Sequence, residues 1–214
     1  MLFVVHRRSI ALKAMETFKT IIKDKSMGLF SGDTKEINCD YVFSTIQTIY
    51  KPENRQLFSK EEFDYILIDC PAGIEQGFKN AIAGADRAVV VTNAEISSIR
   101  DADRIIGLLE AAEIKNPELV INRIRPNMVR KGEMMDVDDI VDLLSIDLIG
   151  VVPDDEYIIT QTNKGEPVIQ NKKAPSGKAY IEIAKRVLGE KIEITIPGRE
   201  KGFWAKIKRL FKKQ

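Results

Sequence analysis

The sequence has few of the residues from which metal sites and disulfide frameworks are built. Its 214 residues include two cysteines, Cys39 and Cys70, and one histidine, His6. The spacing of the cysteines matches no zinc motif, and a single histidine cannot complete a metal site. No secretory leader and no long apolar run is present. These absences predict a cytoplasmic protein in a reducing compartment.

The chain as a whole has almost no net charge, but its C-terminal residues are strongly basic. There are 33 lysines and arginines against 32 acids, a net charge of +1. The whole molecule therefore has no general attraction to nucleic acid. Residues 199–214, however, contain seven basic residues and one acid. With 44% hydrophobic and 30% charged residues, the rest is typical of one soluble α/β domain with appendages.

A short apolar run, residues 65–68, ends in an acid at Asp69. It is too short for a typical helix, which predicts a buried parallel strand. Ligands of open α/β sheets bind at the carboxyl ends of such strands, and an acid there can hold the magnesium ion of a nucleotide. The following Pro71, Ala72 and Gly73 can turn sharply and bring backbone N–H groups near a phosphate. The alternative, about equally favoured, is that Asp69 only caps the next element.

Further motifs follow in a fixed order. They are residues 69–75 (Asp-Cys-Pro-Ala-Gly-Ile-Glu), 98–104 (Ser-Ile-Arg-Asp-Ala-Asp-Arg), 120–123 (Val-Ile-Asn-Arg), 150–155 (Gly-Val-Val-Pro-Asp-Asp) and a basic amphipathic tail. Through them, residues 62–214 resemble the MinD family of bacterial division-site ATPases, within the ParA/MinD group of P-loop ATPases. The resemblance implies a Rossmann-like α/β fold, with a mostly parallel sheet flanked by helices and a C-terminal amphipathic helix. It also implies a protein that binds the inner membrane face and recruits a division inhibitor, blocking aberrant septum placement.

The resemblance assigns roles to particular residues. ATP and Mg²⁺ are the implied cofactors, with Asp69 as catalytic residue and metal ligand and Pro71, Ala72 and Gly73 beside the phosphates. Asn122 and Arg123 match positions that contact adenine, and Pro153 and Asp155 match a second base-side loop. An asparagine at a strand end suits the donor and acceptor pair of adenine, although an asparagine in a turn is equally common.

A helix surface is the implied partner site. Arg100, Asp101 and Asp103 match the surface that binds a MinC-like division inhibitor and overlaps the site of a MinE- or DivIVA-linked regulator. An ATP-dependent homodimer is also implied. The alternative is that these residues form an acidic first turn favoured by the helix dipole.

The phosphate-binding loop of the family does not occur in these residues. No Gly-x-x-x-x-Gly-Lys-Ser/Thr motif is present. Without its N–H groups and lysine, the β and γ phosphates lose most of their counter-charge. We therefore expect a base pocket without a phosphate pocket, and defective hydrolysis, so whether the chain is an enzyme stays open.

The first 61 residues resemble a different family. Residues 3–7 (Phe-Val-Val-His-Arg), 31–32 (Ser-Gly) and 45–48 (Thr-Ile-Gln-Thr) are similar to a superfamily-two helicase or restriction-type ATPase segment. The pattern predicts strands over residues 2–5 and 41–43, a helix over residues 9–22 and a loop over residues 28–38. We hypothesise a hybrid chain with a helicase-like segment (1–61), a MinD-like domain (62–196) and a membrane-targeting helix (197–214).

The basic tail has an amphipathic pattern that stands without any resemblance. On a helix, the apolar residues Phe203, Trp204, Ile207, Leu210 and Phe211 occupy one arc, and Lys206, Lys208, Arg209, Lys212 and Lys213 occupy the opposite arc. Such a helix lies in an anionic membrane interface, so we expect peripheral attachment to the inner face. The alternatives are docking on a protein, a non-enzymatic membrane-tethered adaptor, or a helicase-like nucleic-acid-binding hybrid. The apolar arc makes nucleic acid the weakest candidate.

Overall fold

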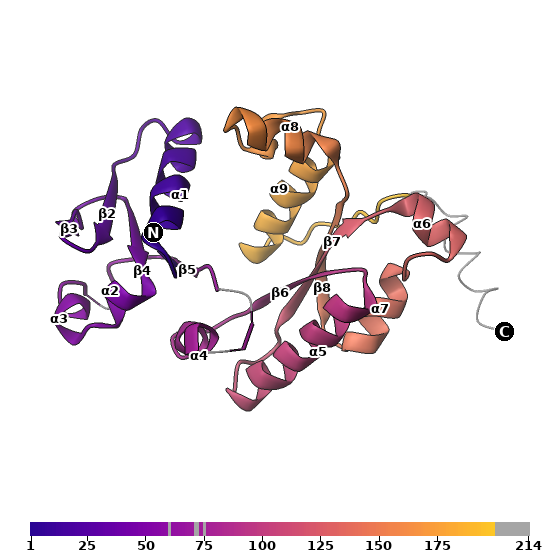
Figure 1. The fold of residues 1–214 in the computed structure, drawn as a ribbon, viewed down its shortest axis with the longest axis horizontal. Coiled ribbons are helices and arrows are strands. Elements are labelled where there is room, and N and C mark those ends of the chain that lie inside the picture. Colours follow the sequence, from indigo (N-terminus) through magenta and orange to yellow (C-terminus); the bar gives the residue numbers. More distant parts are fainter. Residues whose placement is uncertain (60, 71–72, 75, 200–214) are drawn as a thin grey trace. The chain divides into compact units, whose positions relative to one another are not determined.

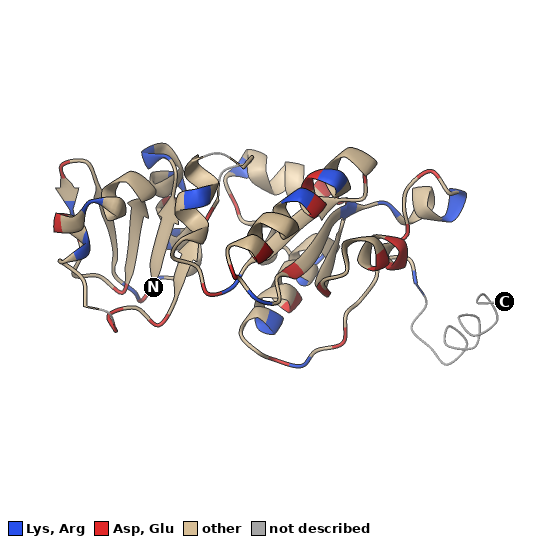
Figure 2. Ribbon diagram, turned by 90° about the horizontal axis from the view of Figure 1, so that it is seen from below, with Lys and Arg blue, Asp and Glu red and all other residues tan. Residues whose placement is uncertain are grey.

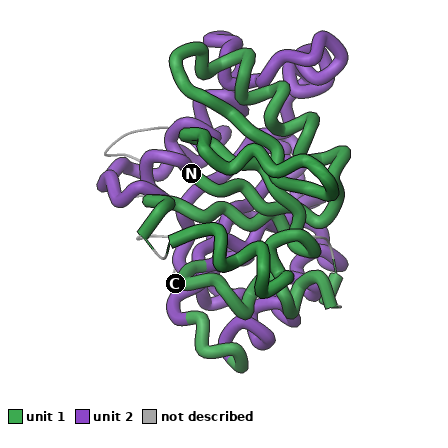
Figure 3. The backbone as a smooth tube through the Cα atoms, turned by 90° about the vertical axis from the view of Figure 1, so that its left-hand side faces the viewer, with its two compact units in different colours: residues 1–87, 111–114 green, residues 88–110, 115–214 purple. Residues whose placement is uncertain are grey.

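The computed structural model describes residues 1–59, 61–70, 73–74 and 76–199. The chain divides into two compact units, residues 1–87 with 111–114 and residues 88–110 with 115–214 (Figure 3). Each unit has its own sheet. None of the helices in the described ranges has the length and apolarity that crossing a bilayer requires.

Unit 1 contains a five-stranded sheet in the order β3-β2-β4-β1-β5. Its elements are β1 (Leu2–Val5), α1 (Arg8–Ile21), β2 (Met27–Ser31), β3 (Thr34–Lys35), β4 (Tyr41–Thr45), α2 (Ile46–Tyr50), α3 (Pro52–Arg55), β5 (Ile66–Ile68) and α4 (Gln76–Ile82). All strands are parallel except β3, which forms an antiparallel hairpin with β2. The predicted strands and long helix are confirmed. The loop predicted over residues 28–38 is wrong, because this hairpin occupies most of it.

Alternation along the strands of unit 1 places apolar side chains on both faces of its sheet. Leu2 and Val4 join one cluster of buried residues, and Val5 joins another with Ala11 of α1. On the α1 face, the Phe18 ring packs edge-on against that of Phe43, with centroids 5.3 Å apart. Figure 1 shows α1 lying along this sheet. Covering both faces is what a parallel sheet requires.

Strand β5 differs from the sequence prediction in its burial. It pairs in parallel with β1, as expected. It is nevertheless the edge strand of its sheet, and Ile66 and Leu67 are 57% and 51% exposed. The prediction of a buried strand is therefore wrong, because an apolar run shows that a strand forms but not where the strand lies in the sheet.

Unit 2 contains a three-stranded parallel sheet in the order β6-β7-β8. Its elements are β6 (Val89–Asn93), α5 (Ile96–Ala111), β7 (Glu118–Ile124), α6 (Pro126–Lys131), α7 (Val137–Leu144), β8 (Asp147–Pro153), α8 (Glu156–Lys164), the 3-10 helix η1 (Val168–Gln170) and α9 (Pro175–Val187). The predicted α/β class with parallel sheets flanked by helices is confirmed. The predicted C-terminal amphipathic helix lies outside the described residues.

Helices cover both faces of the sheet in unit 2, with α9 on one face and α5 and α7 on the other (Figure 1). Helix α9 approaches β8 closely at Gly150, where an added Cβ would lie 2.2 Å from Cγ1 of Ile183. Val120, Ile149 and Val152 form the buried cluster under α9. This packing fixes the carboxyl ends of β7 and β8, where the predicted base-side residues lie.

Candidate functional site

Asp69 lies at the carboxyl end of β5, as the sequence predicts. Its backbone N–H donates to the Val4 carbonyl oxygen at 2.8 Å, which continues the pairing of β5 with β1. Its side chain is exposed. Gly73 has a φ of +96°, a left-handed conformation that favours glycine, and an added Cβ would meet nothing within 4 Å. Pro71 and Ala72 lie outside the described residues.

The described surroundings of Asp69 do not favour a thiol nucleophile. Desolvation, and then the charge of Asp69, raise the pKa of the Cys70 thiol, which favours the protonated, less nucleophilic form. No cluster of three or more metal-ligating side chains occurs among the described residues. Mg²⁺ does not require one, because one or two carboxylates, phosphate oxygens and water complete its usual shell.

The carboxyl ends of β7 and β8 in unit 2 carry a separate group of predicted site residues. The register of the two strands shifts between Ile121 and Ile124, and Arg123 between them has a φ of +56°. Bulges and left-handed non-glycine residues are concentrated near functional sites. The Asn122 Oδ1 accepts a hydrogen bond from the Arg123 N–H at 3.0 Å. Pro153, the partner of Ile124, ends β8 at the same edge.

An arginine pair and one carboxylate lie at this edge. Arg123 Nε is 3.5 Å from Asp154 Oδ1, and Arg125 Nε is 2.6 Å from Asp154 Oδ2. The three groups leave one positive charge in excess, available to an anionic or π-rich ligand. Because both arginine side chains are at least half exposed, each ion pair contributes at most about 1 kcal/mol and can give way to a ligand.

Arg125 is a candidate residue that the motif comparison missed. Its signal is the spacing Arg-x-Arg after the asparagine at the end of β7. Strand alternation does not apply here, because Arg123 has a left-handed conformation and Arg125 lies beyond the end of β7. The folded structure is therefore needed to show that both arginines reach Asp154.

The carboxylate of Asp155 accepts hydrogen bonds from other residues of the chain. One of its oxygens accepts from the Tyr157 N–H at 3.0 Å, which caps α8. The other accepts from the Ser176 N–H at 3.0 Å and the Ser176 hydroxyl at 2.6 Å. Burial alone would raise the pKa of Asp155, but the hydrogen bonds from Ser176 and Tyr157 outweigh it and lower that pKa. The carboxylate therefore joins the starts of α8 and α9, and a direct contact with a base stays a prediction.

The predicted partner residues lie on the solvent side of α5. Arg100, Asp101 and Asp103 are exposed, whereas the opposite side of the helix is buried through Ile99, Ala102, Ile106 and Leu109. The helix begins at Ile96, earlier than the sequence indicated, so these acids lie beyond the first turn. The dipole of the helix acts mainly within the first turn and does not account for them. Figure 2 shows charges of both signs along this helix.

The predicted membrane residues, from Phe203 to Lys212, lie outside the described residues. The structure therefore describes the segment that leads to the tail and ends at Arg199.

Comparison with known proteins gives two separate likenesses. A family model for the type III restriction enzyme res subunit matches residues 1–70, which confirms the resemblance of the first segment. The septum site-determining protein MinD of Bacillus subtilis (strain 168) is 54% identical over 154 residues, 71% of this chain and 58% of that protein.

Two solved MinD structures resemble most of the chain. The MinD cell division protein of Aquifex aeolicus superposes with a TM-score of 0.67 at 30% identity, covering 91% of this chain and 99% of that one. The chain belongs to the MinD family. The MinC:MinD cell division protein complex of Aquifex aeolicus provides a match with a TM-score of 0.66 at 29% identity, covering 91% of this chain and 98% of the other. The chain spans 50 to 58% of the length of the first two curated MinD relatives that it matches.

The role of Asp155 in stability can be tested directly. We expect Asp155→Ala to lower the free energy of unfolding at pH 7 by about 1 to 2 kcal/mol, because the caps of two helices are lost. The pKa of this carboxyl is lower in the folded than in the unfolded chain. Its contribution is therefore present above the unfolded pKa and is lost as the pH falls through the folded value.

Urea unfolding of wild type and variant at pH 7 and pH 3 measures this difference. Asp154→Ala is the control, since it removes only exposed ion pairs. Equal losses for the two variants at pH 7 would contradict the assignment.

Proposed function

We propose that this chain is a MinD-type cell-division protein that attaches to the inner face of the cell membrane and recruits a division inhibitor against aberrant septum placement. The observation that carries the proposal is the 54% identity to MinD of Bacillus subtilis. On this proposal, residues 62–196 form the MinD-like domain, residues 197–214 the membrane segment, and residues 1–61 a helicase-like segment joined to them.

Nucleotide binding is proposed to be weak. The base-side residues Asn122 and Arg123 support binding of adenine, and Arg125 adds a donor beside them. Asp69 supports binding of Mg²⁺. The phosphate loop does not occur in the 214 residues, so most of the counter-charge of the phosphates is missing. We therefore propose that hydrolysis by this chain is defective.

A titration with a fluorescent ATP analogue and magnesium tests this proposal. We expect no saturation below millimolar nucleotide, and we expect adenosine to compete about as well as ATP, because the phosphates contribute little. Saturable micromolar binding, with ATP much better than adenosine, would contradict the proposal and indicate a phosphate site elsewhere in the chain.

The exposed side of α5 is the proposed partner surface. Arg100, Asp101 and Asp103 present charges of both signs outward from a helix whose other side is buried. The existence of a MinC:MinD complex among the similar structures supports a MinC-like inhibitor as the partner. A MinE- or DivIVA-linked regulator and a homodimer are proposed on the family resemblance alone.

Membrane attachment through the tail rests on the opposite arcs of apolar and basic residues. Each buried apolar side chain contributes up to about 1.5 to 3 kcal/mol, and each cation near an anionic surface about 1 kcal/mol. Ordering the helix opposes this by about 1 to 2 kcal/mol per residue. One tail is therefore marginal, and a dimer with two tails binds more firmly through effective concentration.

Replacing Trp204 by glutamate tests the tail. We expect the affinity for phosphatidylglycerol vesicles to fall by roughly tenfold or more, because one apolar contact is lost and a charge enters the apolar arc. Ala205→Glu adds the same charge on the opposite, basic arc and serves as the control in the same vesicle sedimentation assay. Equal effects of the two substitutions, or unchanged binding by Trp204→Glu, would refute the tail hypothesis. An affinity for vesicles that is the same with and without ATP would favour a non-enzymatic adaptor.

A nucleic-acid function is the second candidate, favoured by the match of residues 1–70 to a restriction-enzyme subunit. Arg7 and Arg8 follow β1 at the carboxyl edge of the sheet of unit 1, and Arg8 Nη2 donates to Thr34 Oγ1 at 3.2 Å. On the proposed function we expect no binding of a labelled single-stranded oligonucleotide at physiological salt, measured by fluorescence polarisation. Micromolar binding that Arg7→Glu with Arg8→Glu abolishes would favour this alternative.

A further inference from the structure

The segment between α9 and the tail is held against unit 2 at its beginning by a buried arginine. Arg186 donates from Nε to the Ile192 carbonyl oxygen at 2.9 Å, from Nη2 to that of Glu193 at 2.6 Å, and from Nη1 to that of Ile149 in β8 at 3.0 Å. Its side chain is only 9% exposed. Several hydrogen bonds from a buried charged donor make this a firm attachment.

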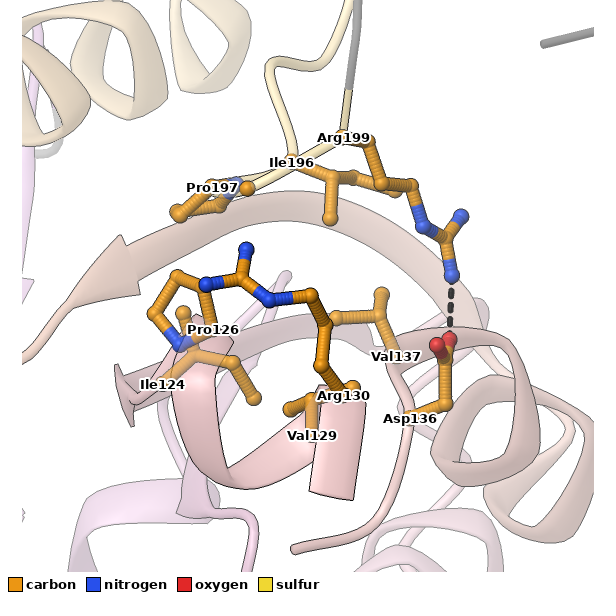
Figure 4. A pocket seen from close by; sticks show the side chains of 10 residues that line it. Ile124, Pro126, Val129, Arg130, Asp136, Val137, Ile196, Pro197 and Arg199 are labelled. Atoms are coloured by element: carbon orange, nitrogen blue, oxygen red, sulfur yellow. Dashed lines mark hydrogen bonds and ion pairs between the residues drawn. The ribbon is translucent and has the colours of Figure 1, made fainter. Parts of the chain in front are cut away.

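A second arginine, Arg199, holds the end of the same segment by binding two aspartates at the start of α7. Its Nη1 donates to Asp138 Oδ1 at 3.0 Å, and its Nη2 is bonded to Asp136 Oδ1. Figure 4 shows the Arg199 side chain pointing toward Asp136. Both residues line a cavity of about 100 Å³. Gly198 has a φ of +78°, and an added Cβ there would lie 2.5 Å from Cβ of Pro126. Residues 196–199, here called the tail root, thus rest on α6 and α7.

The two attachments differ in exposure. The Arg199, Asp136 and Asp138 side chains are 34%, 40% and 41% exposed. Ion pairs of this kind contribute little and are screened by salt, whereas the hydrogen bonds of buried Arg186 are not. Asp136 also accepts from the Asp138 N–H at 3.0 Å and caps α7, so it stays in place without the arginine. The Arg199 end is therefore the end that can open.

The charges around the tail root indicate that it opens when another anion replaces the two aspartates as the partner of Arg199. Arg199 is the first of the basic residues of the tail, but in this contact it faces two carboxylates, which leave a net negative charge. Desolvation would lower the pKa of Arg199, but the bonds to Asp138 and Asp136 outweigh it and raise that pKa, so the guanidinium stays charged. Figure 2 shows the basic end of α6 and the acidic start of α7 beside this segment. Arg130, which also lines the cavity, is hydrogen-bonded to Asn127.

We propose that Arg199 exchanges between the two aspartates in the free protein and the phosphate of an anionic phospholipid at the membrane, so that the contact opposes attachment of the tail. A phosphate offers the guanidinium the same paired oxygen acceptors as a carboxylate. The negative potential of the bilayer repels Asp136 and Asp138 and attracts the arginine. The inference rests on the proposed membrane function of residues 197–214.

Vesicle binding by the full chain tests the exchange. Asp136→Asn with Asp138→Asn releases Arg199 while keeping a capping residue at the start of α7. We expect its affinity for phosphatidylglycerol vesicles to rise roughly fivefold. Asp139→Asn with Asp142→Asn removes the same charge from the same helix but leaves the contact of Arg199 with Asp136 and Asp138 intact. We expect this variant to raise the vesicle affinity less than twofold. A similar gain for both double variants would overturn the proposal, because charge alone would then explain it.

Replacing the arginine gives the complementary result. Arg199→Gln loses both the contact and the lipid-binding cation, so we expect the affinity to change less than twofold. Lys208→Gln removes a cation of the basic arc that the proposal does not assign to this contact, and we expect a loss of roughly fivefold. Equal losses for the two variants would overturn the exchange. Phosphatidylcholine vesicles should not distinguish the aspartate variants.

Trypsin cleavage without vesicles reports the contact itself. Asp136→Asn with Asp138→Asn should speed cleavage after Arg199 several-fold relative to cleavage after Lys191, whereas Asp139→Asn with Asp142→Asn should not. Unchanged cleavage would overturn the contact, and acceleration of wild-type cleavage by millimolar inorganic phosphate would overturn the assignment to lipid. If the contact is confirmed but the wild-type chain binds no vesicles, the proposed function fails, and the exchange fails with it.

Discussion

Parallel pairing of β7 with β8 is the constraint on which the candidate site depends. It places the carboxyl ends of both strands at one edge, so Asn122 and Arg123 come to lie beside the loop that starts at Pro153. The bulge in β7 then turns Arg123 out of the regular ladder. Helix α6 begins directly after this strand end and carries the surface on which the tail root rests. The proposed base site and the tail root therefore both border the short turn between β7 and α6.

Local patterns in the sequence predicted what depends on neighbours along the chain. Strand β1, helix α1 and the terminal position of Asp69 all follow from apolar periodicity and from the residues at which it stops. Contacts between distant residues could not be predicted in this way. Asp155 binds Ser176, 21 residues away, and Arg199 binds Asp136, 63 residues away. Such contacts depend on how helices pack on the sheet, which no local pattern encodes.

Strand β5 shows the same limit in a different form. The run that ends at Asp69 has the composition of a buried strand, and both family resemblances include such a strand. Ile66 and Leu67 are nonetheless exposed, and the strand lies at the edge of the sheet of unit 1. Whether a strand is buried depends on its position in the sheet, and that position depends on which other strands pair beside it.

Three arginines of unit 2 show how exposure decides what a charge can do. Arg186 is buried and donates to three carbonyl oxygens, so its charge serves the fold and is not available to a ligand. Arg125 and Arg199 are bonded to carboxylates that water also reaches, so each bond is weak enough for another anion to replace. A sequence shows three equal positive charges. Only the exposed ion pairs can open without unfolding, and they lie at the two places, the strand ends and the tail root, where a nucleotide and a membrane are proposed to bind.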